Sequence, residues 1–317
     1  YFSKLAEKHP DQAWHKRNGW EILSSICESL TGAEQQQCEE KFGSKCDAEY
    51  VPEPVFSGVR SGSVSHRAPD DIGSLEVDEI VKRLKNEYRP EELNKKFQHD
   101  DIFSPRGPEG LGDALKEDIK KRTDKYLEKL NEFFEPGLIS AYYVYSLLRG
   151  IEELLSNKVA FNIGQAEKVL SFFQLVTDAG STKPFEPEKI DGAWLADWIA
   201  VHKVSVDVLL QLLSHSEFGK QLQKEKRPEI LVLIKYFLGI KSSPADKDER
   251  EKGSDLFSIA INSVRGRAFE TLVVFAQNDG DKLETETKHL FEDVLKDSSL
   301  AVRFLVGHYL ATFYFRD

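Results

Sequence analysis

The sequence predicts an all-α protein in which antiparallel helix pairs stack into a solenoid. Helical hydrophobic periodicity continues from Ser74 to the end of the chain, with no alternation of strands and helices. The connections are short and polar, which makes consecutive helices antiparallel neighbours. A Val-Arg pair also occurs twice early in an apolar helix, at Val264-Arg265 and 38 residues later at Val302-Arg303. Stacking in series lets such pairs bury their apolar faces.

The charge balance limits the class of partner. The 317 residues include 54 Asp and Glu against 43 Lys and Arg, which gives a net charge of −11. Phosphate-driven binding needs a basic face, so this total argues against broad binding to nucleic acid or to an anionic membrane. A local basic patch stays open as an alternative.

The sequence also predicts a cytoplasmic protein. The best apolar run, residues 230–240, contains Lys235 and is shorter than the roughly 20 residues that span a bilayer. There is no secretory signal and no Asn-x-Ser/Thr acceptor. The three cysteines, Cys27, Cys38 and Cys46, leave an odd thiol, which argues against a disulfide framework. Because the chain begins at Tyr1 and lacks methionine, we expect a fragment of a longer polypeptide in which omitted methionines shorten some spacings.

The N-terminal part is expected to contain a helical segment and then an irregular one. Periodic apolar residues predict helices over residues 11–30 and 33–42, within an N-terminal helical segment over residues 1–49. Residues 50–73 contain "VPEPVFSGVRSGSVSHRAPDDIG", which is rich in Pro, Gly and Ser. We expect an irregular or extended crossover there.

Residues 74–317 are expected to form the helical repeat domain. Ser74 is a candidate cap for a helix that ends at Tyr88, and Pro90 and Pro108 suit the first turns of the next two helices. Further helices are expected over residues 124–134, 138–155, 165–178, 192–202, 205–214, 228–239, 254–277, 283–296 and 299–315.

The last expected pair gives the Val-Arg motif a structural role. Asp297 lies five residues before Val302-Arg303, where its carboxylate can accept exposed amide protons of the last helix. The valine then faces the core, and the arginine reaches an acceptor in its own or a neighbouring turn. Ile259 stands at the equivalent place before the first Val-Arg pair, so that unit is less regular. An ordinary helical bundle with a chance recurrence is the alternative.

No motif predicts catalysis or a cofactor. Gly107, Gly110 and Gly112 lack the Lys-Ser/Thr of a phosphate loop and favour a helix start. The cysteines lack zinc-site spacing, so a metal site that includes His9 and His15 is the less favoured interpretation. The stretch from His99 to Asp101 is explained by a polar loop better than by a catalytic base. We therefore assign no catalytic, cofactor-binding or metal-binding residue.

Aromatic clusters are the candidate contact sites. They are Tyr142, Tyr143 and Tyr145; Trp194 and Trp198; and Phe313, Tyr314 and Phe315. Packing in the core or between repeats is the favoured interpretation, and any exposed cluster is the first choice for a protein-binding hot spot. The mixed-charge run over residues 247–255 is expected to be a solvated loop.

Four phrases carry a family resemblance: "SPRGPEGLGDALKEDI", "AYYVYSLLRGIEELL", "INSVRGRAFETL" and "VRFLVGHYLATFYFRD". They resemble C-terminal helical regions of large bacterial multidomain proteins, including STAND-type NTPases linked to antiviral defence, and span roughly the last two thirds of the chain. The C-terminal third resembles HEAT and armadillo repeats, whose units are about 40–47 residues long, so a 38-residue step is a short member. The resemblance implies a sensor or scaffold arm, with ATPase and effector domains elsewhere in the parent protein.

The sequence therefore predicts a HEAT-like, non-catalytic module that recognises a protein partner or another domain of its parent chain. Two alternatives remain open. A nucleic-acid-binding solenoid would line its inner curve with Arg and Lys, and an enzyme on a helical scaffold would gather His and carboxylate side chains in a deep pocket.

Overall fold

The chain divides into two compact units, Tyr1–Ser63 and Val64–Asp317. The computed structural model describes Gln36, which is helical, and residues 66–97, 104–157, 161–182, 185, 195–240, 255–279 and 284–314, with side chains as far as Tyr309. Several sequence predictions lie outside these residues. They concern the helices over 11–30 and 33–42, the cysteines, His9, His15, His99–Asp101, Trp194, and the side chains of Phe313, Tyr314 and Phe315.

The described part of the second unit is helical, which confirms the predicted all-α class. Its elements are η2 (Ile72–Ser74), α4 (Val77–Lys85), α5 (Pro90–Lys96), α6 (Pro108–Lys121), α7 (Thr123–Glu128), η3 (Leu130–Phe133), α8 (Ala141–Ser156), α9 (Ile163–Thr182), α10 (Trp198–Ser214), α11 (Gly219–Glu225), α12 (Arg227–Gly239), α14 (Leu256–Ile261), α15 (Val264–Asn278), α16 (Thr285–Leu295) and α17 (Leu300–Tyr314). Extended pairing in the described residues is limited to two isolated bridges, Arg67 with Arg106 and Pro136 with Ile139.

Helices begin at the two prolines predicted to open them, but no helix begins at Ser74. Pro90 and Pro108 each open a helix, as predicted. Ser74 was expected to cap a helix, but its hydroxyl donates to the carbonyl of Asp71 within a 3-10 turn. The following helix begins only at Val77, because the 3-10 turn occupies the residues before it.

Other boundaries differ from the prediction as well: the helix expected over 124–134 is divided into α7 and η3, and α11 was not expected. Two further differences involve serine hydroxyls. Trp198–Ser214 is one continuous helix where two were expected, because the Ser205 hydroxyl donates to the carbonyl of Val201 instead of ending the helix. The single helix expected over 254–277 is broken. Ser263 caps α15 by accepting the amide of Gly266, so α14 ends at Ile261.

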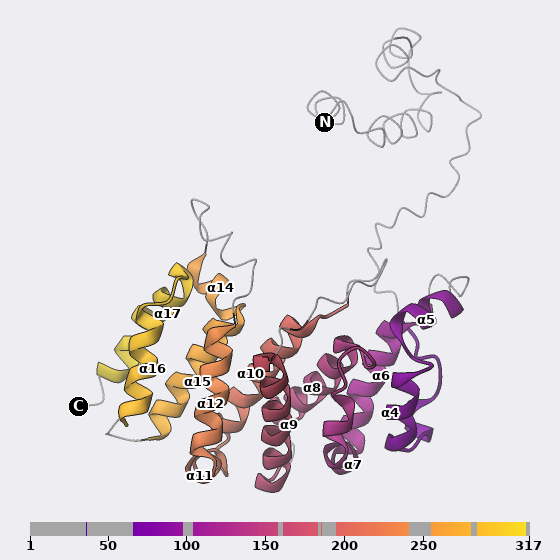
Figure 1. The fold of residues 1–317 in the computed structure, drawn as a ribbon, viewed down its shortest axis with the longest axis horizontal. Coiled ribbons are helices and arrows are strands. Elements are labelled where there is room, and N and C mark those ends of the chain that lie inside the picture. Colours follow the sequence, from indigo (N-terminus) through magenta and orange to yellow (C-terminus); the bar gives the residue numbers. More distant parts are fainter. Residues whose placement is uncertain are drawn as a thin grey trace. The chain divides into compact units, whose positions relative to one another are not determined.

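The helices of the second unit pack in two layers. One layer contains α6, α8, α10, α15 and α17, each packed against the next in that order. The other contains α7 with η3, then α9, α12 and α16. Figure 1 shows the helices following one another in chain order, from indigo α4 to yellow α17.

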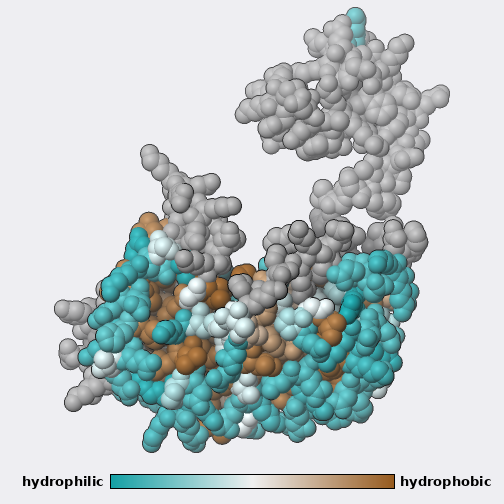
Figure 2. Space-filling view, in the orientation of Figure 1, coloured by the Kyte–Doolittle hydropathy of each residue, from teal (hydrophilic) through white to brown (hydrophobic). Residues whose placement is uncertain are grey.

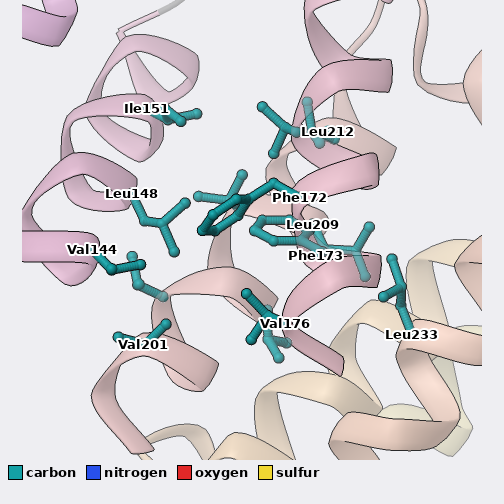
Figure 3. Close-up of a cluster of buried hydrophobic side chains, with 14 of the residues drawn as sticks. Val144, Leu148, Ile151, Phe172, Phe173, Val176, Val201, Leu209, Leu212 and Leu233 are labelled. Atoms are coloured by element: carbon teal, nitrogen blue, oxygen red, sulfur yellow. The ribbon is translucent and has the colours of Figure 1, made fainter. Parts of the chain in front are cut away.

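The core is continuous between the two layers. Phe172 and Phe173 of α9 are fully buried, and Figure 3 shows them among side chains of the neighbouring helices in both layers. Those neighbours include Val144, Leu148 and Ile151 of α8, Leu209 and Leu212 of α10, and Leu233 of α12. Each layer therefore buries the apolar face of the other.

The glycines at the start of α6 serve close packing. A side chain at Gly110 would overlap the backbone of Arg67. That backbone is fixed there, because the Arg67 amide donates to Pro105 O at 2.9 Å and Arg67 O accepts from Gly107 N at 3.2 Å. The glycine-rich stretch thus opens a helix beneath an extended segment.

A fragment covering residues 74–317 should give the far-UV circular dichroism of a helical protein. The expectation follows because the described residues of this range lie mostly in helices. Substantial β-content in that spectrum would contradict it.

Among the described residues, no helix has both the length and the apolar character needed to cross a membrane.

Candidate functional site

Asp297 joins the two Val-Arg pairs. The guanidinium of Arg265, at the start of α15, donates to Asp297 Oδ1 at 2.6 Å. The guanidinium of Arg303, on α17, donates to the backbone carbonyl of Asp297. Val264 and Val302 are both buried. The two arginines therefore meet at one turn, between α16 and α17.

The cap of α17 differs from the one expected. Asp297 Oδ1 accepts the amide of Ser299 at 2.7 Å, one residue before the helix. The amide of Val302 is instead taken by the Ser299 hydroxyl at 3.2 Å. Ser299 is therefore the capping side chain, and Asp297 holds the turn that precedes it.

The pair formed by Arg265 and Asp297 is shielded from water. The Arg265 side chain is 3% exposed and that of Asp297 is 13% exposed. A desolvated guanidinium needs its carboxylate, because an unpaired buried charge is costly. The contact consequently ties α15 to the turn between α16 and α17.

A second cluster of charges joins α12, α15 and α16. Arg227 donates to both carboxylate oxygens of Asp279 and to Glu284 Oε2 at 3.0 Å. Gln223 donates to Asp279 Oδ1 at 2.7 Å. No pattern in the sequence predicts this cluster, because its contacts join residues more than 50 positions apart.

The layer that runs from α6 to α17 carries a row of partly exposed polar side chains, which we call the ionic strip. Its members are Lys120 of α6; Arg149, Glu152 and Glu153 of α8; Asp207 of α10; Arg267 and Glu270 of α15; and Tyr309 of α17. Every helix of that layer contributes at least one member.

Ion pairs across the strip link neighbouring helices. Lys120 Nζ lies 2.8 Å from Glu153 Oε2, which connects α6 to α8. Arg267 Nε lies 2.5 Å from Asp207 Oδ1, which connects α15 to α10. Arg267 also donates to Glu270 of its own helix.

Burial raises the pKa values of two groups of the strip, Glu152 and Tyr309. Burial raises the pKa of Glu152, and the nearby charge of Asp207 raises it further, against the opposing effect of Arg149. Burial, together with a hydrogen bond to Glu270, raises the pKa of Tyr309 to about 12. The Tyr309 hydroxyl lies 2.5 Å from Glu270 Oε1 and so extends the strip onto α17.

The aromatic clusters within the described residues are mainly internal. Tyr143 is buried, and its hydroxyl donates to the carbonyl of Tyr88 at 2.7 Å. Trp198 is 5% exposed and stacks on Phe185 with ring centroids 4.5 Å apart. Tyr142 and Tyr145 are half-buried. Core packing is the interpretation that the sequence favours, and it holds for Tyr143 and Trp198.

The charged run over 247–255 is described only at Asp255, which caps α14.

His202 is a buried histidine in the cluster around Trp198. It is 3% exposed, and its Nε2 lies 3.3 Å from the hydroxyl of Tyr236. Its Nδ1 has no hydrogen-bond partner among the described residues. Burial lowers the pKa of His202 to about 4, against the opposing charge of Asp197.

Acidification should therefore destabilise the chain through His202. The folded chain keeps the imidazole neutral, whereas the unfolded chain takes up a proton below its ordinary pKa of 6.5. The contribution is complete above pH 6.5 and falls by about 3 kcal/mol as the pH drops toward 4. Urea unfolding from pH 7 to 4.5 should show a shallower loss for His202→Phe than for the native chain. Equal losses in the two proteins would contradict this role.

The described residues offer little for metal chemistry. Among them, no group of three or more His, Cys, Asp or Glu side chains is arranged to hold a metal ion. The Asp297 turn, the cluster around Asp279 and the ionic strip all connect helices. Comparison with protein families, with curated proteins and with solved structures finds no match for this chain.

Proposed function

We propose that the second unit is a HEAT-like α-solenoid that acts as a protein-binding scaffold. The observation that carries the proposal is the ionic strip, which runs along one layer across α6, α8, α10, α15 and α17. A series of helices in which each packs on its neighbours provides an extended surface of that kind. The setting implied by the family resemblance, an arm of a larger multidomain protein, belongs to the same proposal.

The charges of the strip favour a protein partner over nucleic acid. Its four carboxylates, on Glu152, Glu153, Asp207 and Glu270, stand beside three cations, on Lys120, Arg149 and Arg267. A phosphate backbone would meet as much repulsion as attraction there. A protein surface with mixed charges can match such a strip.

The face of the protein shown in Figure 2 has both apolar and polar surface. Figure 2 shows apolar side chains gathered in a band across the middle of one face, bordered by polar side chains. Apolar surface with a polar rim is typical of protein-interaction sites. This distribution supports recognition of a folded protein or of a helical segment.

A pair of matched double variants tests the proposal. Lys120→Ala with Arg149→Ala removes two cations of the strip, and Lys168→Ala with Lys235→Ala removes two exposed cations of the opposite layer. Affinity purification of the full chain from cell extract, with quantitative mass spectrometry, should show the same partners for the native chain and the second variant. The strip variant should lose them.

Two results would count against the scaffold proposal. One is equal recovery of partners by the two double variants. The other is tight binding of a fluorescent DNA duplex by the native chain at physiological salt, which would favour the nucleic-acid alternative.

A further inference from the structure

One side of α8 carries a row of two tyrosines and an arginine, which we call the α8 row. Its members, Tyr142, Tyr145 and Arg149, are spaced so that they lie one above the other along the helix. All three are half-buried. Both tyrosine rings pack against the hydrophobic core and keep part of their surface in water. Tyrosine and arginine are enriched among the residues that anchor protein–protein contacts.

Arg149 is the cation of the ionic strip that joins no two helices. Lys120 and Arg267 each bind a carboxylate of a neighbouring helix. The guanidinium of Arg149 donates to Glu152 of its own helix, and a pair of that kind contributes little to stability. Its side chain is also the most exposed of the three, at 38% against 23% and 24%. Arg149 is therefore not needed to hold the layer together.

Arg149 and Tyr145 keep hydrogen-bond donors that no described residue uses. A guanidinium carries several N–H donors in a planar fork, and among the described residues that of Arg149 is bonded to the Glu152 carboxylate alone. The hydroxyl of Tyr145 has no hydrogen-bond partner in the described part of the chain. Because Glu152 is 16% exposed and holds the guanidinium, the remaining donors are ordered before a partner arrives. Such ordering lowers the entropic cost of binding.

These donors fit a carboxylate. A carboxylate accepts paired hydrogen bonds from an arginine fork and has lone pairs left for a hydroxyl. Glu152 and Glu153 lie about one turn from Arg149 on the same helix. A phosphate group, with its larger negative charge, would meet more repulsion from them than a carboxylate would.

We propose that the α8 row binds an aspartate or glutamate side chain of the protein partner. Arg149 forms the ion pair with this side chain, Tyr145 is the second donor, and the exposed part of the Tyr142 ring adds apolar contact. The inference rests on the scaffold function proposed above and names the chemistry that its partner presents.

Selection from a phage library of random peptides on the immobilised full chain tests the proposal. Peptides that bind the native chain should share an Asp or Glu at one position. Fluorescence polarisation then gives the dissociation constant of a selected peptide. Replacing its acid with the matching amide should raise that constant at least about tenfold, because a charged hydrogen-bonded pair is lost.

Three variants of the chain locate the contact. Arg149→Glu should raise the dissociation constant of the acidic peptide at least about tenfold, and a peptide with lysine in place of the acid should restore binding. Lys168→Glu makes the same change of charge at an exposed residue of the opposite layer and should leave binding unchanged. Tyr145→Phe keeps the ring and removes the hydroxyl, so it should raise the constant about two- to tenfold.

The outcomes separate this inference from the scaffold proposal. Selected peptides without a shared acid, or an Arg149→Glu variant that binds the acidic peptide as the native chain does, would overturn the role of the α8 row and leave the scaffold standing. A native chain that selects no peptide would contradict the scaffold proposal itself. Where Arg149→Glu unfolds the protein, Tyr145→Phe decides, and binding equal to that of the native chain would contradict the inference.

Discussion

Replacing Asp297 with alanine is expected to destabilise the protein by about 3–5 kcal/mol. The substitution leaves the guanidinium of Arg265, whose side chain is 3% exposed, without its carboxylate partner. It also removes the acceptor of the Ser299 amide. Loss of a cap alone would cost only about 0.5–2 kcal/mol, so the size of the effect distinguishes a buried ion pair from a cap. Urea unfolding of the native and variant chains at pH 7 gives this difference.

Two further variants check the origin of that loss. Asp293→Ala removes an exposed carboxylate of α16 and should change the stability by less than about 0.5 kcal/mol. Exchanging both partners, Arg265→Met with Asp297→Leu, should recover most of the stability, because no charge is then left buried. If Asp297→Ala and Asp293→Ala cost the same, the buried pair does not hold α15 to the turn.

Phe172→Ala is expected to cost about 3–5 kcal/mol. The ring is fully buried on α9 and meets Phe134 edge-on, with centroids 6.2 Å apart. Truncation opens a cavity between the two layers, which the packed helices around it close only in part (Figure 3). The midpoint and slope of a urea unfolding curve give the change in free energy.

Leu175 provides the matched control on the same helix. It is 37% exposed, and Leu175→Ala should cost less than about 1 kcal/mol, because much of the side chain already meets water. Similar losses for Phe172→Ala and Leu175→Ala would show that α9 does not carry the core between the layers.

The helical class was predictable because the signals that carry it are local. Apolar residues at helical spacing and prolines at Pro90 and Pro108 act within a few residues of the helix that they define. Local competition produced the errors. A serine hydroxyl can cap a helix, bond within a turn or bond back to a carbonyl of its own helix. Ser263 caps, Ser74 bonds within a turn and Ser205 bonds back, and in each case the sequence pattern indicated something else.

The polar contacts could not be predicted from the sequence, because the residues that form them are far apart along the chain. Asp297 was singled out because it stands close to Val302-Arg303, yet its buried partner, Arg265, is 32 residues away in sequence. Asp207 and Arg267 of the ionic strip are 60 residues apart, and no pattern of spacing joins them. The order in which the helices pack brings these pairs together, and that order is a tertiary property.

The central claim is that the helices of the second unit stack in series. Spin labels at Glu117 on α6 and His308 on α17, both exposed, test it by pulsed electron–electron double resonance. The native cysteines are replaced with serine, and the sample is diluted with unlabelled chain so that only distances within one chain are measured. Four steps of about 10 Å, from α6 through α8, α10 and α15 to α17, predict a separation of about 40 Å. A separation below about 25 Å, typical of helices in one closed bundle with neighbours about 10 Å apart, would contradict the account.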